Sequence, residues 1–339
     1  MRFMEKLYFI DKKVGETTSE CILRLRLMYV EIGDQKVGHL GTLDPMASGL
    51  MIFMVGDGTK QFTEMQKMDK TYTFSIIFGV ETDSWDVLGV VKQYQVLGIK
   101  YNEGAGGDLS ARMNKELRIM NNEGQGDDLS TAVEMTKIAV EMTEAVGEMT
   151  EAVMTELAGG NGKDGVRMKD KPTKSHGPMT NDQEDDFSLR SKDIINHFKG
   201  KIMQCPPPYS AIRINGKPLY WWFRNNRQDE IEIKPREREI FSIEMTNFYD
   251  FDIELFKDDL EIIRQIDGDF RQKEIIEKWR EIFKAFENAG IKKLPAADMM
   301  VRCSSGTYIR SLVHDIGEKL GVPCFAYNIR RVAIGDQKL

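Results

Sequence analysis

The chain has 339 residues, of which 41% are hydrophobic and 30% charged, as in ordinary globular proteins. It contains no run of about 18 uncharged apolar residues, which excludes a membrane-spanning helix. The first ten residues are too short and too charged for a signal peptide. The composition predicts a soluble intracellular protein, cytoplasmic or, in a eukaryotic source, also nuclear.

The net charge of −7 is unfavourable for binding nucleic acid, because phosphate contacts require Lys and Arg. The acidity, however, is concentrated in two stretches. Residues 96–195 carry 19 acidic and 12 basic side chains, and residues 250–294 carry 12 acidic and 9 basic ones. The remainder has 23 acidic and 26 basic residues, so RNA binding is compatible with the rest of the chain but is not demonstrated by it.

The cysteines and histidines show no ligand spacing. Disulfide frameworks and zinc sites need closer or more numerous ligands. We therefore predict reduced cysteines and no metal site. The residues concerned are Cys21, Cys205, Cys303, Cys324, His39, His176, His197 and His314.

The first predicted elements lie in residues 1–95. Residues 6–10 favour a strand, and residues 71–78 alternate like a strand with one polar face. Thr17-Thr-Ser-Glu20 is typical of a capping box that opens a helix. That helix has Leu23, Leu27 and Val30 on one face.

Residues 96–186 differ in character and are predicted to be a low-complexity, largely disordered insertion. Residues 103–130 are rich in Gly, Asn and Asp, and such composition cannot offset the entropy of ordering a backbone. A seven-residue repeat follows over residues 134–154. Three heptads with Ala at two of the three d positions bury little and favour a marginal helix, and the alternative is a helix that pairs with a partner.

Residues 253–293 are predicted to be a second, helical insertion packed on the body of the protein. Ile262, Ile263 and Ile266 form one apolar face. A second face follows at helical spacing and consists of Ile275, Ile276, Trp279, Ile282, Phe283 and Phe286.

The C-terminal block contains a further predicted helix, residues 311–320, which Gly321 closes. Strands and helices do not alternate strictly, so the sequence favours an α+β fold with a mixed or antiparallel central sheet flanked by helices. The predicted catalytic domain consists of residues 1–95, 187–252 and 294–339.

The window from Gly38 to Gly49 is the most unusual in the sequence. Three glycines, a proline and a histidine accompany a single carboxylate, Asp44. Such residues indicate a tight loop, and a rigid loop that presents one Asp suits a nucleophile. The alternative is an Asp that bonds its own backbone in an Asp-Pro turn.

This window resembles the signature loop of the TruB-type tRNA pseudouridine synthases, Gly-His-x-Gly-Thr-Leu-Asp-Pro-x-Ala-x-Gly. Further motifs follow in the order of that family. They are Gly58-Thr-Lys60, Asp69-Lys-Thr-Tyr72, the stretches 78–86, 206–220 and 303–317, and Asn328-Ile-Arg-Arg331. The resemblance leaves residues 96–186 and 253–293 without a counterpart.

The resemblance implies a pseudouridine synthase fold and isomerisation of the uridine at position 55 in the T-loop of tRNA, without cofactor or metal. Asp44 then corresponds to the catalytic carboxylate, and Arg310 to the arginine that keeps it ionised and oriented. Tyr72 corresponds to the tyrosine that stacks on the uracil, because the target base must leave its stack.

The resemblance also implies a set of substrate-binding residues. Tyr308 and Ile329 match positions that contact the flipped nucleotide, and His39 matches a histidine that stabilises the rearranged RNA loop. Lys60 and Lys70 belong to two of the motifs. Arg213 and Lys217 flank a predicted Asn215-Gly216 hairpin turn, and basic groups beside aromatic ones suit a nucleic-acid surface.

Two departures and two alternatives accompany this interpretation. Asp11-Lys-Lys13 lacks the proline usual in the family, and the sequence has no room for the C-terminal RNA-binding domain of the PUA type that many relatives carry. We expect a monomer that binds tRNA through its catalytic body. A non-catalytic RNA-binding protein on the same scaffold is the alternative. A hydrolase that uses Asp44 and His39 lacks a second carboxylate or metal site nearby in sequence.

Overall fold

The computed structural model describes residues 7–56, 62–95 and 181–339. The Gly-rich stretch 103–130, the heptad repeat and Lys60 lie outside the described residues, as does most of the insertion predicted for residues 96–186. The three described stretches belong to one structural unit.

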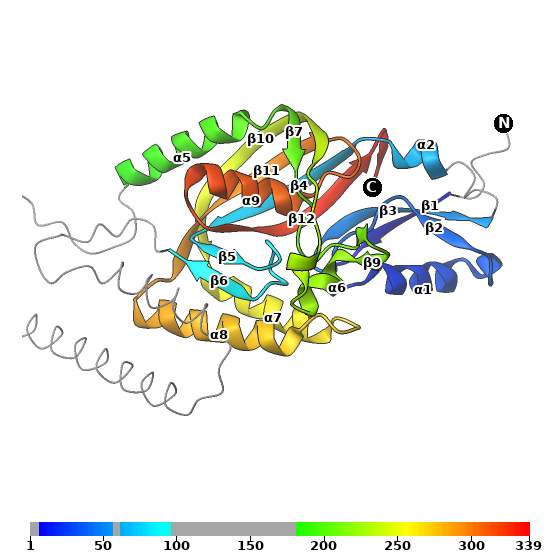
Figure 1. The fold of residues 1–339 in the computed structure, drawn as a ribbon, viewed down its shortest axis with the longest axis horizontal. Helices are drawn as coiled ribbons and strands as arrows, with labels where there is room; N and C mark the ends of the chain where they lie inside the picture. The colour runs from blue at the N-terminus through cyan, green and yellow to red at the C-terminus, as the bar shows by residue number, and fades with distance from the viewer. Residues whose placement is uncertain (1–6, 57–61, 96–180) are drawn as a thin grey trace, which may run out of the picture. The chain divides into compact units, whose positions relative to one another are not determined.

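A large mixed sheet forms the centre of this unit (Figure 1). Its strands follow one another in the order β1 (Leu7–Lys12), β3 (Ser48–Val55), β12 (Cys324–Ile334), β4 (Lys70–Phe78), β11 (Lys293–Cys303), β10 (Arg236–Asp252) and β7 (Gly200–Gln204). Short strands β2 (Val37–His39) and β13 (Gln337–Lys338) pair with β3 and β12. Neighbouring strands are antiparallel except β3 and β12, which are parallel. The predicted α+β fold with a mixed sheet is confirmed.

Helices cover both faces of the sheet. In Figure 1, α5 (Asn181–Asn196) and α9 (Ile309–Leu320) lie on one side, and α7 (Phe256–Gln265) and α8 (Gln272–Asn288) on the other. Alternation along β4 explains the two cores, because successive side chains of a strand point to opposite faces. Phe74 and Ile76 belong to the cluster that contains the apolar residues of α9, and Ile77 belongs to the cluster of α7 and α8.

The remaining elements are short. They are α1 (Thr18–Met28), α2 (Phe62–Gln66), α6 (Leu219–Arg224), the 3₁₀ turns η1 (Val30–Ile32), η3 (Gln228–Glu230) and η4 (Ile253–Leu255), and the hairpins β5 (Val80–Thr82)–β6 (Val91–Tyr94) and β8 (Arg213–Ile214)–β9 (Lys217–Pro218). The predicted Asn215-Gly216 turn joins β8 to β9, and both of its residues have positive φ, as a tight hairpin turn requires.

The predicted capping box is present at α1. The Thr17 hydroxyl accepts a hydrogen bond from the Glu20 amide, and the Glu20 carboxylate accepts one from the Thr17 amide at 2.7 Å. The apolar face proves to be turned outward: Leu23 is 61% exposed, and Leu27 and Val30 are each 81% exposed. Cys21 and Leu25 are the buried residues of this helix.

Residues 253–293, predicted to be helical, contain the helices α7 and α8. Their predicted apolar faces are buried, with Ile262 and Phe283 partly so. The predicted C-terminal helix is α9, which ends at Gly321 in the left-handed conformation. One difference concerns α5: it begins at Asn181, inside the stretch predicted to be a disordered insertion up to residue 186. Within the described stretches, no helix is long and apolar enough to cross a membrane.

Candidate active site

Asp44 lies in the connection between β2 and β3, which we call the Asp44 loop (residues 40–47). The amide of Ala47 donates to the Asp44 carbonyl at 3.0 Å. The ammonium group of Lys12 is fully buried beneath this loop and donates to the carbonyls of Pro45 (2.8 Å) and Ala47. Burial lowers the pKa of Lys12 to about 8. The loop is therefore held by backbone hydrogen bonds and by one cation, as a rigid presenting loop requires.

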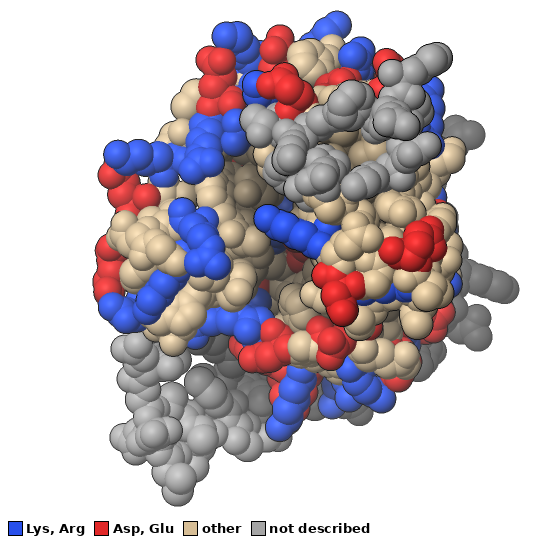
Figure 2. Space-filling view, turned by 90° about the vertical axis from the view of Figure 1, so that its right-hand side faces the viewer, with Lys and Arg blue, Asp and Glu red and all other residues tan. Residues whose placement is uncertain are grey.

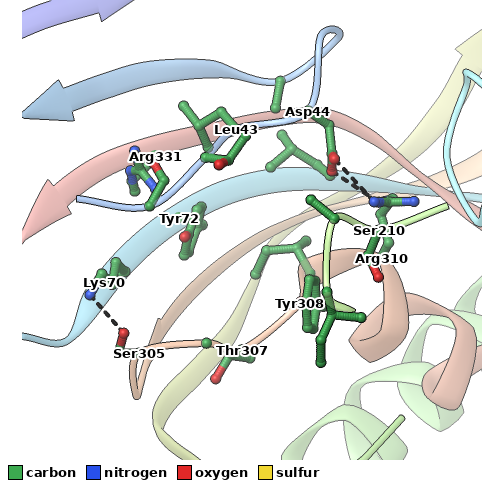
Figure 3. Close-up of a pocket in the computed structure, with 18 of the residues that line it drawn as sticks. Leu43, Asp44, Lys70, Tyr72, Ser210, Ser305, Thr307, Tyr308, Arg310 and Arg331 are labelled. Carbon is green, nitrogen blue, oxygen red and sulfur yellow. Dashed lines mark hydrogen bonds and ion pairs between the residues drawn. The ribbon is translucent and has the colours of Figure 1, made fainter. Parts of the chain in front are cut away.

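Arg310, the second residue of α9, pairs with Asp44. Its Nε lies 2.9 Å from Asp44 Oδ2 as an ion pair, and its Nη2 donates a hydrogen bond to Asp44 Oδ1 at 3.0 Å (Figure 3). The Arg310 side chain is 4% exposed, whereas that of Asp44 is 38% exposed. A two-pronged contact with a buried guanidinium fixes the orientation of a carboxylate. The two residues predicted to form a pair thus share one cleft.

A second carboxylate, Asp86, approaches the same guanidinium. Its Oδ2 lies 3.5 Å from Arg310 Nε, and its side chain is 6% exposed. Burial raises the pKa of Asp86 to about 6, although Arg310 acts in the opposite direction. Arg310 also donates to the carbonyls of Ser84 (2.9 Å) and Tyr209 (3.4 Å). Its orientation therefore depends on the loops that carry these two residues.

A pocket of about 410 Å³ opens beside Asp44. Asp44 is the only carboxylate among the described residues that line it. Five cationic side chains line the same pocket, namely Lys70, Arg236, Arg238, Arg310 and Arg331. Lys and Arg side chains also border the hollow at the centre of Figure 2. This surplus of positive charge suits a polyanionic ligand, although the chain as a whole is acidic.

Three predicted substrate residues line the pocket with Asp44. Tyr72 on β4, Tyr308 at the start of α9 and Ile329 on β12 come from distant parts of the sequence. Figure 3 shows the Tyr72 and Tyr308 rings in the pocket. Burial raises the pKa of Tyr72, so its hydroxyl stays neutral at physiological pH. Together these side chains supply an apolar and aromatic part of the pocket lining.

Lys70 also lines the pocket, but its donors are engaged with the protein. Its Nζ donates to the carbonyls of Gln66 (2.7 Å) and Met68 and to Ser305 Oγ at 3.0 Å. Burial lowers the pKa of Lys70 to about 8. An ammonium group has three donors, so this geometry favours holding the pocket wall over binding a phosphate.

Three other predicted substrate residues lie outside the residues that line the pocket. His39 is half-buried beside Phe53, and burial lowers its pKa. Arg213 is exposed and bonds the Gly216 carbonyl at 2.7 Å. The Lys217 ammonium lies 3.3 Å from the centroid of the Trp221 ring. The predicted hairpin residues therefore form a separate basic and aromatic surface.

The sequence did not indicate the roles of Arg236, Arg238 and Arg331. Arg331 is fully buried and donates to the carbonyls of Leu50 (2.7 Å) and Gly41 (3.1 Å), and so supports the Asp44 loop from β12. Gly49 permits the backbone of β3 to lie close to that of β12, because a Cβ at this position would lie 2.2 Å from the Arg331 carbonyl oxygen. Arg331 belongs to a motif that resembles the family, whereas nothing local distinguishes Arg236 and Arg238 from surface arginines.

The model of the TruB family pseudouridylate synthase N-terminal domain matches residues 29–103 and 167–258. The chain belongs to this TruB family. The unmatched stretch between the two segments, residues 104–166, is shorter than the predicted insertion 96–186.

Curated relatives of this TruB-family chain carry the name tRNA pseudouridine synthase B. That of Aquifex aeolicus (strain VF5) is 24% identical, with 98% of this chain and 69% of the relative covered. That of Lactobacillus johnsonii is 25% identical (96% and 66% covered), and that of Bifidobacterium longum subsp. infantis is 27% identical (97% and 62% covered). The chain thus spans 62–69% of the length of these relatives.

Among solved structures, the crystal structure of a Cbf5-Nop10-Gar1 complex aligns with a TM-score of 0.43 and 16% identity. The alignment covers 100% of this chain and 51% of the other.

Proposed function

We propose that this TruB-family chain converts uridine to pseudouridine in the T-loop of tRNA, at position 55. The observation that carries the proposal is the Asp44–Arg310 ion pair at the wall of a basic, partly aromatic pocket. The names of the curated relatives support tRNA as the substrate.

The reaction is an isomerisation. The bond from C1′ to N1 of uracil breaks, the base rotates, and a bond from C1′ to C5 forms. C5 loses a proton and N1 gains one, so the reaction consumes no co-reactant. Asp44 assists the cleavage, either as a nucleophile at C1′ or as the base that removes a sugar proton. Arg310 orients this carboxylate toward the sugar.

The pocket suits a nucleotide that has left its stack. We propose that the Tyr72 ring stacks on the uracil, and that Tyr308 and Ile329 contact the same nucleotide. Arg236 and Arg238 are placed to meet the RNA backbone, since phosphates are bound mainly by Arg and Lys. Arg213, Lys217 and His39 then contact tRNA outside the pocket, and Lys60 is a further proposed tRNA contact. We propose that the chain acts as a monomer.

A non-catalytic tRNA-binding protein is the alternative function. Binding alone does not require a carboxylate held against a buried guanidinium. The presence of Asp44 in the basic pocket therefore favours catalysis.

The test is to incubate the purified chain with an unmodified tRNA transcript and to map pseudouridine by carbodiimide modification and primer extension. A transcript with cytidine at position 55 is the matched control. We expect a single stop, at position 55, in the first transcript only. Absence of product from the uridine transcript, or product at other positions alone, would overturn the proposal.

A further inference from the structure

Arg271 lies outside the pocket, at the junction between α7 and α8. Its guanidinium makes a two-pronged contact with Asp83: Nη1 lies 2.7 Å from Oδ2, and Nη2 lies 3.0 Å from Oδ1. The side chains are 17% and 11% exposed. Such a fork-to-fork pair, largely shielded from water, is stronger and more directional than a surface ion pair.

Tyr209 completes this cluster. The Arg271 guanidinium lies over the Tyr209 ring, 4.0 Å from its centroid. The Tyr209 hydroxyl donates to Asp83 Oδ2 at 3.3 Å. One arginine therefore holds two segments that are more than a hundred residues apart in the sequence.

Both segments that Arg271 holds also contact Arg310. Tyr209 accepts a hydrogen bond from Arg310 Nη2 through its own carbonyl, at 3.4 Å. Ser84, which follows Asp83, accepts one from Arg310 Nη1 at 2.9 Å. Asp86, which ion-pairs with Arg310, lies in the same turn. The carbonyls that orient the Arg310 guanidinium thus belong to Tyr209, a member of the Arg271 cluster, and to Ser84, the neighbour of Asp83.

The backbone of Arg271 is strained. Its φ is 62° and its ψ is 29°, in the left-handed region that non-glycine residues seldom adopt. Such a conformation costs about 1 kcal/mol or more and persists where the surrounding contacts require it. In this conformation Arg271 contacts Asp83 and Tyr209.

The α7–α8 segment (residues 253–292) also reaches the other partner of the catalytic pair. Gly15 faces Ile262 of α7, and a Cβ there would lie 2.7 Å from Ile262 Cγ2. The Gly15 amide donates to the Pro45 carbonyl at 2.9 Å, next to Asp44. Met46 is buried in the same cluster as the apolar residues of α7 and α8. The segment therefore contacts the supports of both Asp44 and Arg310.

We propose that Arg271 is a positioning residue for the reaction, and that the α7–α8 segment braces the catalytic ion pair from both sides. Arg271 sets the spacing of the 83–86 turn and the Tyr209 segment, and this spacing fixes the Arg310 guanidinium against Asp44. The expected effect of Arg271 on the reaction rate rests on the proposed function. Its expected effect on the orientation of Arg310 does not.

The test compares R271K with R264K. The first change keeps the charge but removes the two-pronged geometry. The second makes the same exchange on α7, where Arg264 forms an exposed pair with Glu261 at 3.0 Å. Single-turnover rate, tRNA binding and urea unfolding are measured for each variant. We expect R271K to lower the rate constant by about 10- to 100-fold, since a displacement of about 1 Å at the reacting groups can cost that much, with the Kd for tRNA within about twofold of wild type.

R264K is expected to leave the rate within about twofold, since exposed pairs contribute little. If R271K instead lowers stability but the folded enzyme turns over at the wild-type rate, Arg271 is merely structural and the inference is wrong.

A second measurement is independent of turnover. In protein labelled with ¹⁵N at arginine, R271K should shift the Arg310 Nε–H signal and speed its exchange with water, and R264K should not. An unchanged Arg310 signal would overturn the inference even in an active enzyme. Failure of the wild type to form pseudouridine would overturn the proposed function, and the Arg310 signal would still decide the role of Arg271.

Discussion

Two carboxylates share the guanidinium of Arg310, and they differ in exposure. Asp44 faces the pocket with 38% of its side chain exposed, whereas Asp86 is nearly enclosed at 6%. Solvent access on one side lets Asp44 reach a substrate. Asp86 is a buried counter-charge to Arg310, and burial brings its pKa to about 6.

The raised pKa of Asp86 predicts a pH-dependent stability. The pKa rises from 3.8 to about 6 on burial, so the folded state binds this proton more tightly than the unfolded state. The free energy of unfolding should therefore fall as pH rises from about 4 to about 6, by on the order of 3 kcal/mol, and then level off. The Asp86→Asn variant has no ionisable group at this position, so its free energy of unfolding should lack this pH dependence.

The measurement is urea unfolding of wild type and Asp86→Asn between pH 4.5 and 8. The difference in unfolding free energy, wild type minus variant, should decrease across the lower half of this range. A difference that stays constant or increases with pH would contradict the burial of an ionisable Asp86.

At the residue scale, the sequence predicts the site where the motifs are local. The loop glycines and the Asp-Pro turn indicate a presenting loop at Asp44, and the resemblance implies Arg310 as its partner. Arg271 is not predictable in this way. Its role arises from contacts with Asp83 and Tyr209, which only the packing of α7 and α8 against the sheet brings together.

At the element scale, α1 shows why an apolar pattern does not by itself identify a buried face. The helix has apolar residues on several sides, and the sheet covers Cys21 and Leu25 instead of the predicted stripe. By contrast, α7 and α8 have charged residues on their outer sides, so the apolar periodicity identifies their buried faces.

The orientation of α1 predicts unequal effects of two identical substitutions. Leu25→Ala removes a fully buried side chain and should lower the free energy of unfolding by about 2–5 kcal/mol. Leu27→Ala removes an exposed one and should change it by less than about 0.5 kcal/mol. Urea unfolding of the two variants tests this, and equal losses would show that the Leu27 face is covered.

At the scale of the whole molecule, the central sheet joins strands from the N-terminal, middle and C-terminal parts of the described chain. The α+β class follows from the mixture of helical and strand patterns. The strand order does not, because the parallel β3–β12 pair joins residues more than 270 positions apart.

The family match leaves residues 104–166 unmatched, and we predict that they are dispensable. Replacing them with a short Gly-Ser linker should leave pseudouridine formation and the unfolding midpoint close to wild type, because loop length affects stability only weakly. Deletion of α7 and α8 serves as the comparison. It removes buried core residues and should prevent stable folding. Loss of product from the first deletion alone would show that residues 104–166 contribute to the reaction.

The most direct test of the account is the single-turnover rate of Asp44→Asn with excess enzyme and a T-loop uridine transcript. The amide keeps the size of the side chain but not its charge. We expect pseudouridine formation to fall by more than about 1,000-fold while tRNA binding persists. Turnover near the wild-type rate would contradict the catalytic role of the Asp44 carboxylate.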